Sequence, residues 1–76
     1  MEGAGSVRII GDIPREAWLE RGDQRAEVGQ PVSAGGWTVV GRFDDGLPGF
    51  LAEVQVQPGG VVDLKCDAAF KRCRVP

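Results

Sequence analysis

The chain has 76 residues, of which 42% are hydrophobic and 26% are charged, and its formal net charge is −2. This length makes one domain with a thin core, because so short a chain buries only about 60–65% of the surface that its unfolded form exposes. The acidic balance argues against a partner such as nucleic acid or an anionic membrane, and no run of about 18 apolar residues is present that could insert into a bilayer.

Turn-forming residues shape the whole chain. Glycine occurs 12 times and proline 5 times, close to double their usual share. They divide the sequence into short segments of alternating apolar and polar residues, with turn signals roughly every 8–12 positions, which is typical of a sandwich or barrel. We predict an all-β fold over residues 7–76, a small antiparallel β-sandwich of six or seven short strands. Residues 1–6 are expected to be a flexible opening segment and partly a cloning remnant.

The first half of the domain is predicted to hold three strands, at residues 7–10, 17–20 and 25–28. Residues 14–24 offer an alternative, because they include several good helix formers after a proline. Gly22 would end such a helix after about two turns, and an isolated helix that short is marginal. The strand interpretation is therefore preferred, with the helical turn left open.

The second half has the clearer patterns. In residues 37–43 every second side chain is apolar or glycine, and residues 52–57 and 61–66 alternate in the same way. The turn at residues 58–60 between the last two segments predicts a hairpin. The inward-facing positions of all these segments give the expected core: Val7, Ile9, Leu19, Val28, Trp37, Val39, Ala52, Val54, Val56, Val62 and Leu64.

Cys66 and Cys73 are the two cysteines of the chain. Without histidine, two thiols cannot complete a four-ligand zinc site, and the spacing differs from the C-x-x-C of redox pairs. The six intervening residues can turn and return within the roughly 4.4–6.8 Å between Cα atoms that a disulfide requires. We expect a disulfide, which implies an oxidising compartment; the alternative is a buried Cys66 and an unrelated Cys73.

Large aromatic residues are the first candidates for a binding surface. Trp37 begins the best alternating face and is expected in the core. Trp18 could lie inside or outside, and Phe50 borders a loop, so these two are our candidate binding aromatics.

A short basic cluster near the end of the chain is the second candidate. It consists of Lys71, Arg72 and Arg74, and on a strand Arg72 and Arg74 would share one face with Lys71 on the other. The cluster fits a solvated strand edge that discourages edge-to-edge pairing, and the functional alternative is a site for an anionic partner.

Catalysis has little chemical support in the sequence. Histidine and tyrosine are absent, and neither Ser6 nor Ser33 has a base in view. Residues 44–46 (DDG) could suggest calcium, but the further oxygen ligands of a calcium loop are missing apart from Glu53. We expect no enzyme, no metal and no cofactor.

Four segments resemble a known family. Residues 13–22 (IPREAWLERG) are similar to the opening of a PEGA domain, in which a proline and a short turn ending in alanine lead into a strand and a glycine turn. Residues 29–31 (GQP) resemble the family's Gly…Pro step, and residues 34–39 (AGGWTV) its glycine–aromatic start of the central hairpin. Residues 54–62 (VQVQPGGVV) resemble its V-x-V-x-x-G hairpin, so the likeness extends over about residues 7–66.

The resemblance implies a compact β-sandwich that is attached to larger extracytoplasmic bacterial proteins and acts as an interaction or spacer module. Two features depart from the pattern: Glu16 stands where the family often has glycine, and residues 66–76 extend beyond its usual final strand. The expected function is thus a non-catalytic accessory module, tethered in a larger periplasmic or cell-surface protein and binding a protein or a cell-envelope component. The alternatives are a structural spacer and a carbohydrate-binding module that uses an exposed Trp18.

Overall fold

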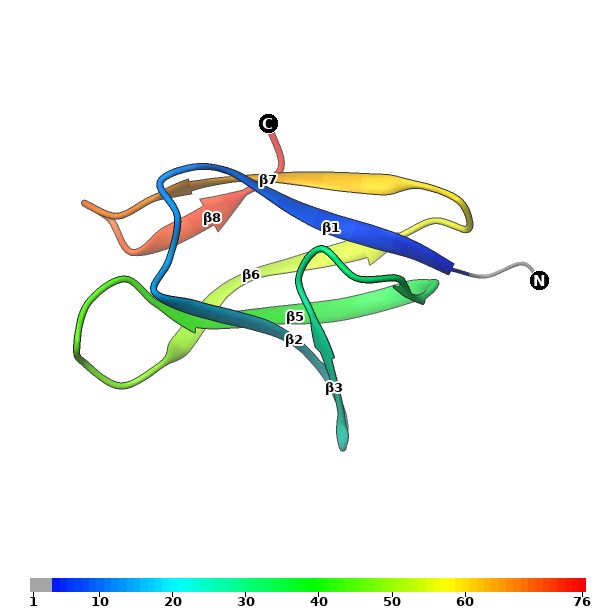
Figure 1. The fold of residues 1–76 in the computed structure, drawn as a ribbon, viewed down its shortest axis with the longest axis horizontal. Helices are drawn as coiled ribbons and strands as arrows, with labels where there is room; N and C mark the ends of the chain where they lie inside the picture. Colours follow the sequence, from blue (N-terminus) through cyan, green and yellow to red (C-terminus); the bar gives the residue numbers. More distant parts are fainter. Residues whose placement is uncertain (1–3) are drawn as a thin grey trace.

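The computed structural model describes residues 4–76. Over this range the chain forms eight strands and no α-helix, arranged as two four-stranded sheets that lie in two layers (Figure 1). The all-β prediction is confirmed, and residues 16–21, part of the segment with the helical alternative, form a strand. Residues 4–76 contain no helix long and apolar enough to cross a membrane.

The first sheet has the order β4-β1-β7-β8, and the second sheet has the order β3-β2-β5-β6. In the first sheet the strands are β1 (Ala4–Gly11), β4 (Val32–Ser33), β7 (Val61–Asp67) and β8 (Arg72–Arg74). In the second sheet they are β2 (Glu16–Arg21), β3 (Gln24–Glu27), β5 (Gly35–Arg42) and β6 (Gly49–Val56).

The predicted hairpin of residues 52–57 and 61–66 is wrong. Its two strands, β6 and β7, belong to different sheets, and the turn at residues 58–60 carries the chain from one sheet to the other. The backbone N–H of Ser6 donates to the carbonyl oxygen of Gly60 at 3.0 Å, so this turn is held by β1. Alternation predicts which side chains are buried, but it does not decide which strand becomes the neighbour.

Two further details of the prediction need correction. The sheets are not wholly antiparallel, because β1 and β7 run parallel, with Val7 opposite Val62 and Ile9 opposite Leu64. This follows from the crossing at residues 58–60, which brings the chain into the first sheet at the end where β1 begins. Within residues 4–76 there are also eight strands instead of six or seven, since the two-residue β4 is too short to show alternation.

The amino-terminal strand begins earlier than the sequence suggested. Residues 4–6 of the predicted flexible segment are part of β1, where Ala4 pairs with Ser33 and Gly5 with Val32. Gly5 is tightly enclosed, because a Cβ atom there would lie 2.5 Å from Cγ1 of Val56. The rest of the predicted flexible segment, residues 1–3, lies outside the described residues.

One hydrophobic core draws its side chains from both sheets. Leu19 and Val39 of the second sheet and Val7 and Leu64 of the first are fully buried. Eight of the predicted core residues are buried, and the other three, Ile9, Val28 and Val62, are partly buried against them. The core also contains four residues outside the prediction: Val32, Leu51, Cys66 and Cys73.

Candidate functional site

Three apolar side chains form a line across the solvent-facing side of the second sheet. Trp18 of β2 lies opposite Val40 of β5, and Val40 lies opposite Phe50 of β6. The neighbours in sequence, Leu19 and Val39, are fully buried, so these three side chains point to the other, outer face. Phe50 is 64% exposed, while Trp18 and Val40 are half-buried. We call Trp18, Val40 and Phe50 the aromatic row.

An irregularity in β6 brings Phe50 into this row. Val39 pairs with Ala52, but the next residue, Val40, pairs with Phe50, so Leu51 is an extra residue in the ladder. With regular alternation Phe50 would share the inner face with Ala52 and Val54. The extra residue is a β-bulge, which turns Phe50 outward and leaves Leu51 buried.

Neighbouring polar groups hold Trp18 in place. Its indole Nε1–H donates a hydrogen bond of 2.7 Å to Oε2 of Glu20, two residues along the same face. The guanidinium carbon of Arg25 lies 4.0 Å from the centroid of the indole ring, a cation–π contact. The indole therefore has a fixed orientation, and the arginine covers one of its faces.

The aromatic row has an acidic border. On the same outer face, Glu16 and Arg42 form an ion pair at 3.0 Å, and Arg25 is stacked on the row itself. Thr38 lies between Glu20 and Glu53, which are its partners on either side. With Glu27, the outer face carries four carboxylates against two guanidinium groups, a net charge of −2.

The structure separates the predicted basic cluster. Arg72 and Arg74 lie on the outer face of β8, flanking the buried Cys73, as expected for a strand. Lys71 is not on that strand, which corrects the prediction. It lies in the preceding turn with a φ of 53°, and its Nζ is 2.9 Å from Oδ2 of Asp44 in the loop between β5 and β6. Trp18 and Phe50 are on the other sheet, so the candidate residues form two separate surfaces.

The contact with Lys71 also changes the acidity of Asp44. The hydrogen bond from Lys71 lowers the pKa of Asp44 below its usual value, and the backbone N–H of Gly46 adds a second hydrogen bond at 2.8 Å. The segment that could suggest calcium is thus a turn in which the Asp44 carboxylate accepts the backbone N–H of Gly46. Among residues 4–76, no three histidine, cysteine or acidic side chains lie together as metal ligands would.

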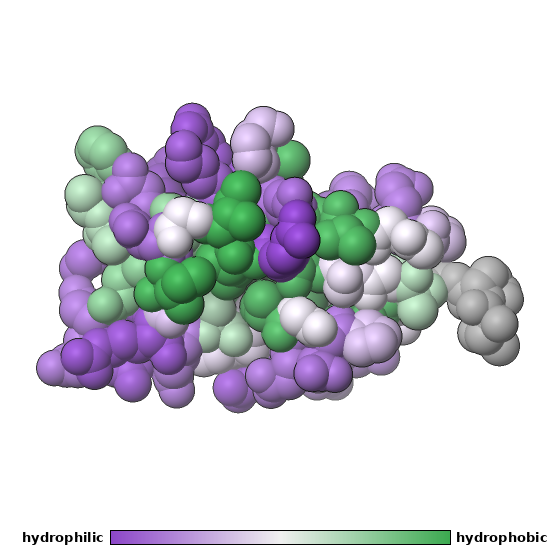
Figure 2. Space-filling model, turned by 45° about the horizontal axis from the view of Figure 1, so that its top comes forward, coloured by the Kyte–Doolittle hydropathy of each residue, from purple (hydrophilic) through white to green (hydrophobic). Residues whose placement is uncertain are grey.

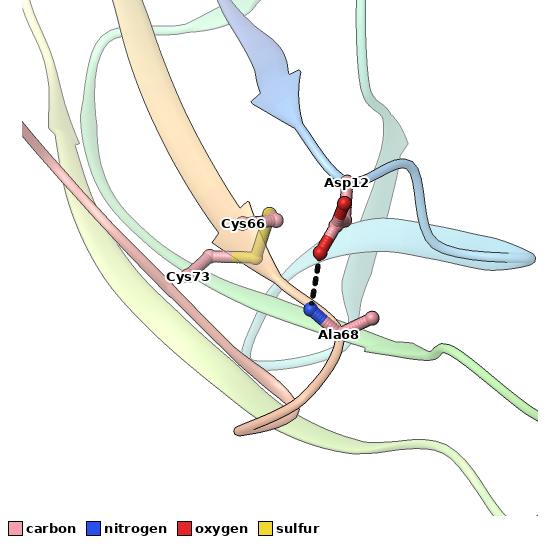
Figure 3. The surroundings of a disulfide bond; sticks show 4 residues. All are labelled: Asp12, Cys66, Ala68 and Cys73. Carbon is pink, nitrogen blue, oxygen red and sulfur yellow. Dashed lines mark hydrogen bonds between the residues drawn. A yellow bond between two sulfur atoms is a disulfide. The ribbon is translucent and has the colours of Figure 1, made fainter.

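The disulfide prediction is confirmed. Cys66 of β7 and Cys73 of β8 lie directly opposite each other, and their side chains are bonded and buried (Figure 3). Their Cα atoms are 3.9 Å apart, slightly closer than the expected range. The alternative of two unrelated thiols is therefore wrong.

Asp12 braces the loop that the disulfide closes. One of its carboxylate oxygens accepts the backbone N–H of Ala68 at 2.8 Å, as drawn in Figure 3. Its own backbone N–H donates to the carbonyl oxygen of Cys66 at 3.0 Å. The turn between β7 and β8 is thus tied both covalently and to the end of β1.

Sequence reasoning missed three contributors to these surfaces: Val40, Arg25 and Lys65. The alternation of residues 37–43 already places Val40 on the outer face of its strand, opposite Phe50 in the structure. The alternation of residues 61–66 places Lys65 on the outer face in the same way, and the structure puts it opposite Arg74. The position of Arg25 over Trp18 had no signal in the sequence, because it depends on the register between β2 and β3.

Comparisons with protein-family models, with curated proteins and with solved structures find no match to this chain.

Proposed function

We propose that this domain is a non-catalytic β-sandwich module that binds a protein partner through the aromatic row. The observation that carries the proposal is the β-bulge at Leu51, which turns Phe50 onto the solvent side in line with Val40 and Trp18. A phenylalanine 64% exposed on the outer face of the edge strand β6 contributes little to the core, and aromatic residues are enriched in the centres of protein interfaces.

The chemistry of the partner follows from the border of the row. The outer face of the second sheet has a net charge of −2, from four carboxylates and two guanidinium groups. We therefore expect a partner surface with an apolar or aromatic centre and lysine or arginine at its rim, since complementary charges increase the rate of association and its specificity.

The setting of the module is part of the same proposal. The disulfide between Cys66 and Cys73 supports an oxidising, extracytoplasmic location, because such bonds rarely persist in a reducing cytosol. The core shared by the two sheets supports a sandwich. Together with the resemblance of about residues 7–66 to PEGA domains, these features favour an accessory module of a larger bacterial envelope protein.

A displayed peptide library, panned on the immobilised oxidised domain, tests the proposal. Enriched peptides should combine aromatic or aliphatic residues with flanking lysine or arginine, and Phe50→Ser should weaken their binding about tenfold or more. Leu47→Ser is the matched control, because Leu47 is 94% exposed but lies in the loop outside the row. Absence of enrichment, or peptides that bind Phe50→Ser as well as the native domain, would refute the proposal and favour the spacer alternative.

Carbohydrate binding through Trp18 has weaker support. Sugars stack on an open aromatic face, but one face of Trp18 is covered by Arg25 and its Nε1–H is already bonded to Glu20. Tryptophan fluorescence titrated with glycans should therefore stay flat in the native domain, and a shift would favour the carbohydrate-binding alternative.

A further inference from the structure

Three cationic side chains gather on the outer face of the first sheet, the sheet that does not carry the aromatic row. Lys65 of β7 lies directly opposite Arg74 of β8, and Arg72 lies two residues before Arg74 on the same face. We call Lys65, Arg72 and Arg74 the basic cluster. Like charges directly opposite each other across two strands are destabilising, so this arrangement has a cost to the fold.

Asp67 of β7 lies directly opposite Arg72, but no carboxylate in residues 4–76 forms an ion pair with the basic cluster. The four ion pairs of this part of the chain use other cations, and none of the three basic side chains has a carboxylate oxygen within 4.0 Å. The nearest acidic residues, Asp12 and Asp67, instead accept the backbone N–H groups of Ala68 and Ala69, at 2.8 and 2.9 Å. Three cations against the one carboxylate of Asp67 thus leave a positive excess here, in a chain whose net charge is negative.

An apolar ring and a hollow adjoin the basic cluster. Phe70, which is 76% exposed, lines the same hollow of about 610 Å³ as the three cations. Figure 2, with the first sheet turned towards the reader, shows hydrophobic residues gathered over the middle of this face among hydrophilic ones. Ile10 lies beside Lys65 on the adjacent strand, and so belongs to this outer face.

We propose that the basic cluster and Phe70 bind an extended acidic peptide segment, with carboxylates at alternate positions. Arg72 and Arg74 are two residues apart on one strand, a separation of about 6.6–6.8 Å that equals the spacing of alternate side chains in an extended peptide. Each guanidinium can hold a carboxylate with two hydrogen bonds, and Phe70 offers contact to an apolar residue of the ligand.

The disulfide fixes β8 against β7 before a ligand arrives. Cys73 lies between the two arginines and is bonded to Cys66 next to Lys65, so all three cations are placed by one covalent link. A broad anionic surface such as a membrane fits less well, because Asp63 and Asp67 lie on the same face and would be repelled. The Asp63 carboxylate is itself occupied by a bidentate pair with Arg8, at 2.9 and 3.1 Å.

Fluorescence anisotropy with a labelled peptide of about eight residues, alternating glutamate with threonine and containing one leucine, tests this site. The native domain should bind it, and a peptide with glutamine in place of glutamate should bind at least tenfold more weakly. Arg72→Gln and Arg74→Gln should each weaken binding several-fold, and raised salt should do the same. Arg15→Gln is the matched control, because it removes one positive charge that does not line the hollow and that is paired with Asp45.

Several outcomes would overturn the proposal: equal binding of the glutamine peptide, an equal effect of Arg15→Gln, or tighter binding of anionic lipid vesicles or inorganic phosphate than of the peptide. Thermal unfolding gives a readout independent of the ligand, since relief of the repulsion from Lys65 should raise the melting temperature of Arg74→Gln; a decrease would contradict the repulsion. Phe50→Ser should bind the acidic peptide normally, so failure of this site and failure of the aromatic row are distinguishable.

Discussion

Gly41 of β5 lies directly opposite Gly49 of β6, but only Gly41 is enclosed. A Cβ atom on Gly41 would overlap the carbonyl oxygen of Glu16 and lie 3.0 Å from Cα of Ala17, whereas a Cβ atom on Gly49 would have nothing within 4 Å. Gly41→Ala should therefore lower the free energy of unfolding by about 1–3 kcal/mol, and Gly49→Ala should change it by less than about 0.5 kcal/mol. Urea titration of both variants checks this, and equal losses would contradict it.

Leu19 should be among the most sensitive positions of the core. It is fully buried and packs with core residues of both sheets, so Leu19→Ala is expected to lower the free energy of unfolding by about 2–5 kcal/mol through lost burial and the cavity left behind. Leu47→Ala makes the same chemical change at a residue that is 94% exposed and should have almost no effect. Chemical denaturation measures the difference, and a similar loss in both variants would show that Leu19 is not central to the core.

The disulfide should supply a large part of the stability of so small a domain. Closing the loop between Cys66 and Cys73 lowers the entropy of the unfolded chain, which raises its free energy by about 2.5 kcal/mol relative to the folded state. Reduction should lower the melting temperature, and Cys66→Ala/Cys73→Ala should show a similar loss that no longer responds to reductant. An unchanged melting temperature on reduction would rule out this stabilising role.

The contact between Lys71 and Asp44 should make part of the stability depend on acid pH. Because the hydrogen bond from Lys71 lowers the pKa of Asp44 in the folded state, its contribution is present above the unfolded value of about 3.9 and is lost as the pH falls through the lowered pKa. Carboxyl NMR should find Asp44 titrating below its usual value, and Lys71→Met should move that pKa upward. Asp44→Asn should lose less stability than the native chain over this acid range, and a normal titration of Asp44 would contradict the coupling.

The alternation of apolar and polar residues predicts the strands and their buried faces, but not the way in which the strands pair. Alternation in residues 37–43 and 52–56 identified the buried faces of β5 and β6, including Trp37 and Val54, because a half-buried strand must repeat every second residue. It could not reveal the parallel pairing of β1 with β7, since the same pattern fits a hairpin or a crossing between sheets. That choice depends on contacts distant in sequence, such as the hydrogen bond from Ser6 to Gly60.

The sequence identifies single residues of the candidate surfaces, but it does not show which of them lie side by side. Trp18 and Phe50 were identified by residue type and by their position beside loops, but their alignment depends on the extra residue Leu51, which alternation alone would have placed differently. Lys71 lies in the turn before β8 with a φ of 53° instead of on a strand, and residue type alone does not show where that strand begins.

The parallel neighbours β1 and β7 also determine how the domain would respond to tension. A pull on Cys73 passes through the disulfide directly to Cys66, near the carboxyl end of β7, while an opposing pull on Ala4 enters at the amino end of β1. In parallel strands these forces load the ladder from Ser6–Val61 to Gly11–Cys66 in shear, so its hydrogen bonds share the load together. Without the disulfide, the hydrogen bonds between β8 and β7 would break one at a time before the β1–β7 ladder was loaded. With the disulfide, residues 67–72 carry no load, and the hydrogen bonds between β1 and β7 have to break together.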